Sequence, residues 1–474
     1  MKLKKLLNGI KVLNAKMLKN VNIENISNNT QDDLSNALYV CLKGKNADGH
    51  ALKQEAQKRG AIAFLVEELD YDFNGLQILV KDTRLAFSIV AKNFYSKNKL
   101  PKIIGITGTN GKTTTTNMVQ HILNQSGKKA GLIGTEGIFY GNQKINLHMT
   151  TPDPLELFKH LNAMAEEGIE YAVMEVSAHA IYLKKIEALN FYVKAITNIT
   201  EDHLDFFGDM QNYAKTKIDF IEKYKGIKVV NLDDQMVYKF LKNKKTFTYS
   251  KRLPADCMAV KLDGAGSEYD VLLNGNELYF KTNLIGYYNV ENALCAALIC
   301  NKIGVKNEDI VKGIASFKSV DGRLNIYKKG EKTAIIDFAH TPDALQKILN
   351  VAKTYAHGRV LCLFGCGGNR DSSKRALMGE IASNLSDYVY ITNDNPRFEN
   401  EKDIANQIAS GIKNNNYEII CDREKAAFVA SNCMCDGDIL VLAGKGTEDY
   451  IEIMGEKLLY SDASVLTTLG FERV

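Results

Sequence analysis

A glycine-rich run at residues 105–116, Gly-Ile-Thr-Gly-Thr-Asn-Gly-Lys-Thr-Thr-Thr-Thr, has the residue types of a phosphate-binding loop. The apolar stretch at 102–106 predicts a buried strand before it, and the pattern at 113–125 predicts a helix after it. At a helix N-terminus, backbone N–H groups and the helix dipole face an anion. Lys112 would reach the terminal phosphates, and the Thr113 hydroxyl would hold Mg²⁺. The sequence therefore predicts a site for a nucleoside triphosphate.

The glycine spacing differs from the common phosphate loop, which has a glycine where this chain has Ile106. Here the glycines are Gly105, Gly108 and Gly111. Because glycine lets the backbone approach a phosphate closely, the strand, the three glycines and the helix still favour a phosphate site.

Two further predicted strands end in groups that bind metal ions. The strand at 171–176 leads into Glu175, Ser177 and His179, and the strand at 191–199 leads into a loop with His203. A carboxylate inside an apolar strand needs a cation or a hydrogen-bond donor, and Mg²⁺ on the nucleotide would meet that need. A hydrogen-bonded structural glutamate and a solvated acidic loop are the alternatives.

Four polar loops follow predicted strands in the last third of the chain, at 337–342, 365–371, 394–397 and 444–448. In open α/β sheets, ligands bind beyond the carboxyl ends of the strands. Two of these loops carry arginine and one carries lysine, which predicts a pocket for an anionic substrate. The glycines at 365–368 fit either a second phosphate cradle or a tight turn.

The order of predicted elements divides the chain into three domains and predicts an α/β fold. Residues 1–98 mix short strands with helices, which predicts a small N-terminal α/β domain. Residues 99–318 alternate apolar strands with helices, which predicts a central parallel sheet with the phosphate loop and with helices on both faces. Residues 319–474 repeat this order and predict a Rossmann-like C-terminal domain. The main strands are expected at 102–107, 171–176, 191–199, 227–231, 333–338, 359–364, 387–392 and 438–443.

Composition narrows the class of protein. The 60 basic and 56 acidic residues leave a net charge of +4, which argues against a dedicated nucleic-acid binder. No apolar run reaches the roughly 18 residues of a membrane span, and the start of the chain lacks a signal-peptide pattern. The nine cysteines are scattered, so we interpret them as reduced thiols of a cytoplasmic protein. We expect a monomer that acts on small molecules.

In their order along the chain, several motifs together resemble those of the Mur ligase family. They are Gly-x-Thr-Gly-Thr-Asn-Gly-Lys-Thr-Thr, Met-Glu-Val-Ser-x-His, Asp-His-Leu-Asp, Asp-x-Ala-His-x-Pro-Asp and Gly-Cys-Gly-Gly-x-Arg-Asp. The resemblance covers nearly the whole chain. It implies an ATP-dependent ligase of peptidoglycan precursor synthesis, in which ATP phosphorylates the D-glutamyl carboxylate of UDP-N-acetylmuramoyl-L-alanyl-D-glutamate. The amine of meso-2,6-diaminopimelate then attacks the acyl phosphate, giving an amide, ADP and phosphate.

The resemblance also assigns the nucleotide and metal contacts. One Mg²⁺ is expected on Thr113 and Glu175, and a second on Glu175, His203 and Lys217, and these residues with Lys112 form the expected catalytic set. Contacts with ATP are assigned to Gly108, Thr109, Asn110, Gly111, Lys112, Thr113, Thr114, Asn289, Asn292, Arg323, Asp337 and His340.

From the residues alone, a lysine at 215 or 217 would be an ordinary surface charge. In the family, however, the lysine four residues after a tyrosine is carbamylated by CO₂, and Lys217 stands four residues after Tyr213. The neighbouring Lys215 does not have that spacing. Unmodified Lys217 would place like charges together, so the resemblance implies that the carbamate is the active form.

The sugar–peptide substrate is expected between the first two domains. The family positions there correspond to Thr30, Lys45, Asn46, Ala47, Thr150, Thr151, Ser177 and Lys185. This chain departs from the family at Asn29-Thr30-Gln31, and at Leu183 and Lys185, where the family has glutamine and arginine. Lys185 keeps the charge without the planar fork of arginine.

The amino-acid substrate is expected on loops of the C-terminal domain. By resemblance, its contacts are Arg370, Asp394, Asn395, Pro396, Arg397, Gly444 and Glu448. Diaminopimelate carries a second amino-acid head, with a carboxylate for Arg370 and Arg397 and an ammonium for Glu448. The lone ammonium of lysine would be repelled by two arginines. One departure is Thr447, where the family has histidine.

Three alternatives remain at this point. The lysine-adding ligase and folylpolyglutamate synthetase belong to the same superfamily; Arg397 argues against the first, and the full three-domain length argues against the second. A P-loop regulatory or motor ATPase belongs to another class. The lack of a clear apolar run ending in Asp, together with the four C-terminal loops, weighs against that class.

Overall fold

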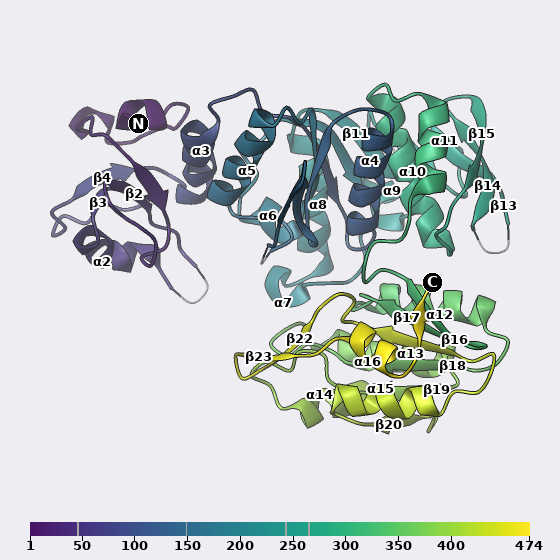
Figure 1. Ribbon diagram of the computed structural model, residues 1–474. Coiled ribbons are helices and arrows are strands. Elements are labelled where there is room, and N and C mark those ends of the chain that lie inside the picture. The colour runs from purple at the N-terminus through teal and green to yellow at the C-terminus, as the bar shows by residue number, and fades with distance from the viewer. Residues whose placement is uncertain (45–46, 148, 242–243, 264–265) are drawn as a thin grey trace. The chain divides into compact units, whose positions relative to one another are not determined.

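The computed structural model describes residues 1–44, 47–147, 149–241, 244–263 and 266–474 (Figure 1). They form two compact units, each assembled from separate stretches of the chain. Unit 1 consists of Met1–Thr107, Gly127–Ala195 and Asp219–Lys228, and unit 2 of Gly108–Ser126, Ile196–Ile218 and Val229–Val474. Both units are α/β, which agrees with the predicted fold class, whereas the limits of the three predicted domains stay a prediction.

The N-terminal part of unit 1 is a parallel four-stranded sheet in the order β1-β2-β3-β4. Its strands are Asn25–Ser27 (β1), Ala37–Val40 (β2), Ala61–Val66 (β3) and Leu76–Leu79 (β4). Alternate strand residues pack with α1 (Leu3–Leu6) and α3 (Thr83–Tyr95) in one apolar core. The intervening residues pack with Ala56 of α2 (Lys53–Lys58) in a second core, so both faces of the sheet are covered.

The remaining strands of unit 1 run in the order β10-β5-β9-β6-β7-β8. They are Lys102–Thr107 (β5), Ala130–Gly134 (β6), Gly137–Tyr140 (β7), Gln143–Ile145 (β8), Tyr171–Glu175 (β9) and Phe191–Ile196 (β10), with helices α5 (Pro154–Glu166) and α6 (Ala178–Tyr182). Strand β9 pairs in parallel with both β5 and β6, whereas β7 and β8 are antiparallel. Every residue of β9 is buried, because a parallel strand inside an α/β sheet has helices on both faces.

The central elements of unit 2 include helices that follow the phosphate loop and strands in the order β15-β14-β13-β12-β11. These strands are Ile227–Asn231 (β11), Phe247–Ser250 (β12), Cys257–Leu262 (β13), Glu268–Leu273 (β14) and Asn276–Lys281 (β15). The β13–β14 and β14–β15 pairs are antiparallel. The helices are α4 (Lys112–Gln125), α7 (Leu204–Phe207), α9 (Gln235–Leu241), α10 (Tyr287–Lys302), α11 (Asn307–Ser316) and α8 (Met210–Lys223), which belongs to unit 2 as far as Ile218. Helix α4 packs against α10 and α11.

The C-terminal sheet of unit 2 has the order β20-β19-β18-β21-β17-β16-β24. Its strands are Asn325–Lys329 (β16), Lys332–Asp337 (β17), Val360–Phe364 (β18), Tyr388–Ile391 (β19), Tyr417–Ile419 (β20), Ile439–Ala443 (β21) and Glu472–Arg473 (β24). The five strands from β20 to β17 are parallel, and β16 and β24 extend the sheet in antiparallel pairs. The predicted strands at 333–338, 359–364, 387–392 and 438–443 are therefore confirmed to within one or two residues.

Helices cover both faces of the C-terminal sheet, as a Rossmann-like domain requires. On one face, strand residues such as Cys362 and Val441 pack with α12 (Pro342–Tyr355), α13 (Lys374–Leu385) and α14 (Glu401–Ala409). On the other face, their neighbours Leu363 and Leu442 pack with α15 (Arg423–Asn432) and α16 (Asp462–Thr468). This alternation of strand side chains between two apolar cores holds the sheet in its register.

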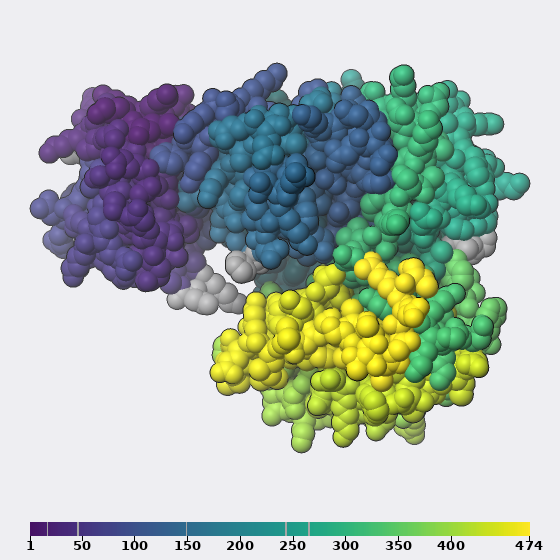
Figure 2. Space-filling view, viewed as in Figure 1, coloured from purple at the N-terminus to yellow at the C-terminus, as the bar shows by residue number. Residues whose placement is uncertain are grey.

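A hairpin of β22 (Tyr450–Ile453) and β23 (Glu456–Leu459) forms a separate two-stranded sheet, in which Leu458 and Leu459 are exposed. The C-terminal part of the chain is yellow in Figure 2. All nine cysteines are free thiols. Among the described residues, no helix has both the length and the apolar character needed to cross a bilayer.

Candidate functional site

The phosphate loop of unit 2 has the backbone geometry of an anion cradle. Helix α4 begins at Lys112, directly after Gly111, whose φ of 84° is in the left-handed region. Gly108 has a φ of 148°, and a Cβ atom there would lie 1.8 Å from Thr197 Oγ1. The glycines at these two positions therefore allow the turn and its close approach to the loop that follows β10.

The loop after β10 holds the phosphate loop through backbone and side-chain hydrogen bonds. Asn198 Oδ1 accepts a hydrogen bond from Asn110 N at 2.8 Å, and the Asn198 carbonyl accepts one from Thr109 N at 2.9 Å. Thr197 Oγ1 donates to the Asn110 carbonyl at 2.6 Å. These contacts between the two loops hold the phosphate loop in its conformation.

Lys112 and Lys217 bring two amines to the phosphate loop. Lys112 Nζ donates to the carbonyls of Gly108 and Thr109, each at 3.0 Å. Lys217 Nζ donates to the Gly108 carbonyl at 2.8 Å and lies 4.8 Å from the centre of the Tyr213 ring. Two lysines therefore share one carbonyl oxygen.

The Lys217 side chain is 1% exposed, and its surroundings favour the neutral amine. Burial lowers the pKa of Lys217 well below its ordinary value, the positive charge of Lys112 lowers it further, and Asp202 opposes this only in part. Lys215 on the same helix is exposed. The four-residue spacing from Tyr213 thus separates a buried lysine from a surface lysine on α8.

His203 lies beside the buried acid Asp202 in the loop before α7. Its φ is 56°, its side chain is 36% exposed, and its Nε2 lies 3.3 Å from Asp202 Oδ2. Burial alone would raise the pKa of Asp202, but nearby positive charges, led by His203, outweigh that effect and lower the pKa to about 2. Lys374 at the start of α13 adds one of these charges, with its Nζ 3.6 Å from Asp202 Oδ1. The sequence analysis did not single out Lys374, although it follows the arginine–aspartate pair of the 365–371 loop.

In unit 1, the structure brings Glu175 together with three predicted substrate residues. Glu175, 1% exposed at the end of β9, accepts hydrogen bonds from Thr135 N at 2.8 Å and Thr135 Oγ1 at 3.3 Å. Thr150 Oγ1 lies 3.1 Å from Thr135 Oγ1, and Thr151 Oγ1 donates to the Glu175 carbonyl at 2.9 Å. Ser177 N donates to Thr151 Oγ1 at 3.0 Å. Hydroxyl groups thus surround the end of β9.

The other predicted sugar–peptide contacts in unit 1 are spread over separate segments. Thr30 is buried after β1, and Ala47 is exposed. Lys185 forms an ion pair with Asp153, with Nζ 2.8 Å from Oδ1. Lys45 and Asn46 lie outside the described residues.

The C-terminal loops of unit 2 converge on a pocket of about 190 Å³. Nearly all predicted diaminopimelate contacts line it, together with residues that precede α7 and follow β17. The lining includes Arg370, Asp394, Asn395, Arg397, Gly444 and Glu448, as well as Asp202, His203, His340 and Lys374. Pro396 is not part of this lining. The carboxyl ends of parallel strands therefore place the predicted residues at one site.

Ionic partners hold the charged side chains of this pocket. Glu448 Oε2 accepts hydrogen bonds from Asn395 Nδ2 at 2.8 Å and from the fully buried Lys445 Nζ at 3.1 Å. Arg397 Nε donates to Glu452 Oε2 at 3.2 Å, and its Nη1 donates to the Gly368 carbonyl at 2.8 Å. The sequence analysis missed Lys445 and Glu452 as partners.

The glycines at 365–368 serve close packing between two loops. A Cβ on Gly365 would lie 2.1 Å from the Thr392 carbonyl oxygen, and a Cβ on Gly368 would lie 1.9 Å from the Pro396 carbonyl oxygen. These glycines therefore let the 365–371 loop lie directly against the 392–397 segment, which accounts for them without a second phosphate.

Of the predicted ATP contacts in residues 319–474, Arg323 reaches the start of α4. Arg323 Nη2 donates to Thr113 Oγ1 at 3.3 Å, and its guanidinium lies 4.5 Å from the centre of the Phe338 ring. Burial raises the pKa of Asp337, although Arg323 opposes this. Burial lowers the pKa of His340, whose Nδ1 lies 2.8 Å from the Phe338 carbonyl oxygen.

Asn289 and Asn292 are buried on α10. Asn292 Nδ2 donates a hydrogen bond to Asn289 Oδ1 at 3.1 Å. Asn292 Oδ1 also accepts a hydrogen bond from Thr115 at 3.3 Å, and it lies 2.4 Å from the position of a Cβ on Gly111. Asn292 therefore supports the N-terminus of α4 directly.

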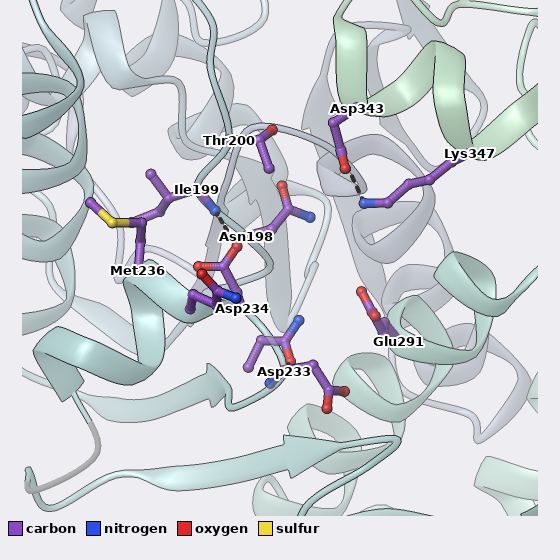
Figure 3. A pocket seen from close by; sticks show the side chains of 11 residues that line it. Asn198, Ile199, Thr200, Asp233, Asp234, Met236, Glu291, Asp343 and Lys347 are labelled. Atoms are coloured by element: carbon purple, nitrogen blue, oxygen red, sulfur yellow. Dashed lines mark hydrogen bonds and ion pairs between the residues drawn. The ribbon is translucent and has the colours of Figure 1, made fainter. Parts of the chain in front are cut away.

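A second pocket of about 320 Å³ adjoins the phosphate loop, and it is strongly acidic (Figure 3). Asp343 accepts hydrogen bonds there from Lys347 and from Asn110 Nδ2, each at 2.8 Å. Asp234 Oδ2 accepts one from Ile199 N at 3.0 Å. Asn110 therefore connects the phosphate loop with the start of α12.

Comparison with known proteins agrees with this site. The model of the Mur ligase middle domain matches residues 106–300, and the model of the Mur ligase glutamate ligase domain matches residues 322–446. A curated relative from Clostridium acetobutylicum is 39% identical over 473 residues, covering 98% of this chain and 97% of the relative. The chain belongs to the Mur ligase family, so the predicted family and its class, a ligase, are confirmed.

The relatives point to one member of that family. The Clostridium acetobutylicum relative is named UDP-N-acetylmuramoyl-L-alanyl-D-glutamate–2,6-diaminopimelate ligase 1. A solved structure of a UDP-N-acetylmuramoyl-L-alanyl-D-glutamate–2,6-diaminopimelate ligase is 26% identical, with a TM-score of 0.67 and coverage of 94% of each chain. The MurF ligase from Thermotoga maritima in complex with ADP is 20% identical, covers 89% of this chain and 93% of its own, and shares the fold with a TM-score of 0.63.

Substitution of Gly108 tests the geometry of the phosphate loop. In Gly108→Ala, the Cβ would overlap Thr197 Oγ1, so the loop must shift, and we expect nucleotide binding to weaken at least tenfold, about 1.4 kcal/mol or more. Titration with a fluorescent ATP analogue measures this. Gly127→Ala is the control, because Gly127 also has a positive φ but has open space around its Cβ position. Equal affinities for the two variants would contradict the assigned loop geometry.

The burial of Lys217 predicts a pH dependence of stability. In CO₂-free buffer the unfolded lysine binds a proton that the folded one releases, so the unfolded state binds more protons and stability rises with pH. As the pH rises toward the ordinary lysine pKa of about 10.4, wild type should gain unfolding free energy relative to Lys217→Met, as measured by urea denaturation. Lys215→Met is the exposed control, and it should follow wild type. Parallel curves for wild type and Lys217→Met would contradict the lowered pKa.

Proposed function

We propose that this chain is the ATP-dependent ligase that adds meso-2,6-diaminopimelate to UDP-N-acetylmuramoyl-L-alanyl-D-glutamate in peptidoglycan precursor synthesis. The observation that carries the proposal is the unit 2 pocket, whose lining combines His203 with Arg370, Arg397 and Glu448. The names of the relatives support the same pair of substrates. ATP as a substrate supports a cytoplasmic location, and a monomer remains our expectation.

The phosphate loop would place ATP for transfer of its γ-phosphoryl group to the D-glutamyl carboxylate. Lys112 and the backbone N–H groups at the start of α4 would stabilise the negative charge that builds up in this transfer. The amine of diaminopimelate would then attack the acyl phosphate and displace phosphate. The C-terminal pocket contributes mainly by orienting that amine, since orientation supplies much of the rate enhancement in such reactions.

Mg²⁺ would neutralise phosphate charge when bound, and Thr113, Glu175, His203 and Lys217 are the residues we assign to it. Lysine is not a ligand for Mg²⁺, which prefers oxygen. The environment of Lys217 suits its conversion to a carbamate, because CO₂ reacts with a neutral amine and burial favours that form. The carbamate would also place a negative charge beside the positive charge of Lys112.

Two arginines favour diaminopimelate over lysine as the amino-acid substrate. Arg370 is exposed at the pocket, and the contacts of Arg397 occupy two N–H groups of a five-donor guanidinium. Both arginines therefore have N–H donors for the carboxylate of the second amino-acid head of diaminopimelate. Glu448, held by Asn395 and Lys445, would accept the distal ammonium.

The proposed reaction predicts amino-acid-dependent phosphate release. With ATP, Mg²⁺ and UDP-N-acetylmuramoyl-L-alanyl-D-glutamate, we expect turnover with meso-diaminopimelate and little with L-lysine, measured as inorganic phosphate and as the UDP-linked product. Turnover with lysine alone would favour the lysine-adding ligase. ATP hydrolysis that ignores both amino acids would instead favour a regulatory P-loop ATPase.

The role of Arg370 predicts a change in selectivity. Arg370→Met should raise the KM for diaminopimelate roughly tenfold to a hundredfold, because a charge-assisted hydrogen bond contributes about 1.5–3 kcal/mol. The KM for ATP should stay unchanged in the same steady-state assay. Thr447→Ala, at an exposed neighbouring position, is the control and should behave as wild type. An unchanged KM for diaminopimelate in Arg370→Met would remove Arg370 from the substrate contacts.

A further inference from the structure

A fully buried ion pair lies directly behind the amino-acid pocket. Arg423, the first residue of α15, and Asp462, the first residue of α16, both have side chains that are 0% exposed. Arg423 Nε donates to Asp462 Oδ1 at 2.9 Å, and its Nη2 donates to Asp462 Oδ2 at 2.8 Å. Tyr460 OH donates to Asp462 Oδ1 at 2.7 Å. The mechanism proposed above does not use this pair.

Stability alone is a weak explanation for such a pair. Removing two charges from water costs free energy that their attraction recovers only with good geometry and further hydrogen bonds. Apolar residues of similar size often fill such a site as well or better. The other contacts of the Arg423 guanidinium therefore indicate what the pair does.

The remaining donors of Arg423 join the ends of two strands that are not neighbours. Its Nη1 donates to the Asn393 carbonyl at 3.2 Å, and its Nη2 donates to the Ala443 carbonyl at 3.0 Å. Asn393 follows β19 and Ala443 ends β21, and β18 lies between these strands in the sheet. Among the described strands, no ladder connects β19 directly with β21, so Arg423 supplies a connection that strand pairing does not.

The two carbonyls stand immediately before the loops that line the pocket. Asp394 follows Asn393, and Gly444 follows Ala443, and both line it. Beyond these positions, the loops meet again where Asn395 and Lys445 both contact Glu448. The two loops are therefore joined at their base by one guanidinium and at the pocket by a carboxylate.

We propose that Arg423, oriented by Asp462, is a positioning residue that fixes the spacing of the 394–397 and 444–448 loops and thereby sets affinity and selectivity for the amino-acid substrate. The proposal rests on the function proposed above. A small shift between the two loops would move Arg397 and Glu448 relative to each other, and the carboxylate and the ammonium of one amino-acid head need a fixed separation between the groups that bind them.

The variant Arg423→Lys distinguishes a role in positioning the two loops from a role in stabilising the fold alone. Lysine keeps a positive charge for Asp462, but its compact ammonium does not reproduce the planar fork that reaches two carbonyls and a carboxylate. Arg359→Lys makes the same substitution in an ion pair whose arginine side chain is 46% exposed, and it is the control. Arg359 pairs with Asp438, with Nη2 2.7 Å from Oδ2, and also donates to the Cys433 carbonyl. That pair stands before β18 and β21, at the opposite end of the same sheet.

We expect Arg423→Lys to raise the KM for diaminopimelate roughly tenfold or more relative to Arg359→Lys, since misplacement of about 1 Å has effects of that size. The ratio of diaminopimelate to lysine turnover should fall, whereas the KM for ATP should match that of the control. Hydrogen exchange of the amides in 394–397 and 444–448 should be faster than in Arg359→Lys. Equal KM values, selectivity and exchange in the two variants would overturn the proposal.

If Arg423→Lys unfolds at a lower temperature than its control, the double variant Arg423→Met/Asp462→Leu is tested in its place. We expect the same rise in the KM for diaminopimelate and the same loss of selectivity. A normal KM for diaminopimelate in that double variant would overturn the proposal. If wild type itself uses neither amino acid, the proposed function fails. The exchange comparison then still decides whether Arg423 holds the two loops together.

Discussion

Parallel pairing of strands is the constraint on which the C-terminal site depends. The register that pairs Asp337 with Ala443 and Phe364 with Ile391 brings the carboxyl ends of β17, β18, β19 and β21 to one edge. The four loops that follow these strands are far apart in the chain, yet they lie together because the strand ends that carry them share this edge of the sheet. The apolar alternation of the strands between two helical layers fixes this register, because a slip of one residue would turn each buried side chain to the wrong face.

Charge is distributed so that most cations of unit 2 near these loops have fixed partners. Lys445 pairs with Glu448, Arg397 with Glu452, and Lys374 lies near Asp202. Such pairing orients long side chains that would otherwise lose considerable entropy on binding a substrate. Lys217 is different, because the charge that affects its pKa most is another cation, Lys112, and burial also disfavours its own charge. A chemical change that made this side chain an anion would therefore reverse the charge beside Lys112.

Much of the fold and part of the site could be predicted from the sequence. Apolar runs located the main strands, and glycine spacing with a following helix located the phosphate loop. The polar loops after the strands located Arg370, Arg397 and Glu448, because topology alone decides which ends of parallel strands meet. The four-residue spacing from Tyr213 distinguished buried Lys217 from exposed Lys215.

The remaining features depend on side-chain directions that spacing does not reveal. Lys445, Glu452 and Lys374 are common surface residue types, and only the packed structure shows which acids and bases they meet. The glycines at 365–368 fitted two interpretations until the neighbouring carbonyl oxygens were located. Asn292 was predicted as an ATP contact and supports α4, a role that follows from the packing of α10 on α4.

Transfer of an oxygen atom tests the central claim, activation of a carboxylate by ATP, most directly. The D-glutamyl side-chain carboxylate of the UDP-linked substrate would be labelled with ¹⁸O, and the phosphate released during turnover with diaminopimelate analysed by mass spectrometry. An acyl phosphate must leave one of these oxygen atoms in the phosphate, so the account predicts one ¹⁸O in each phosphate released. Phosphate without label would mean that water attacks ATP directly, and it would contradict the ligase mechanism.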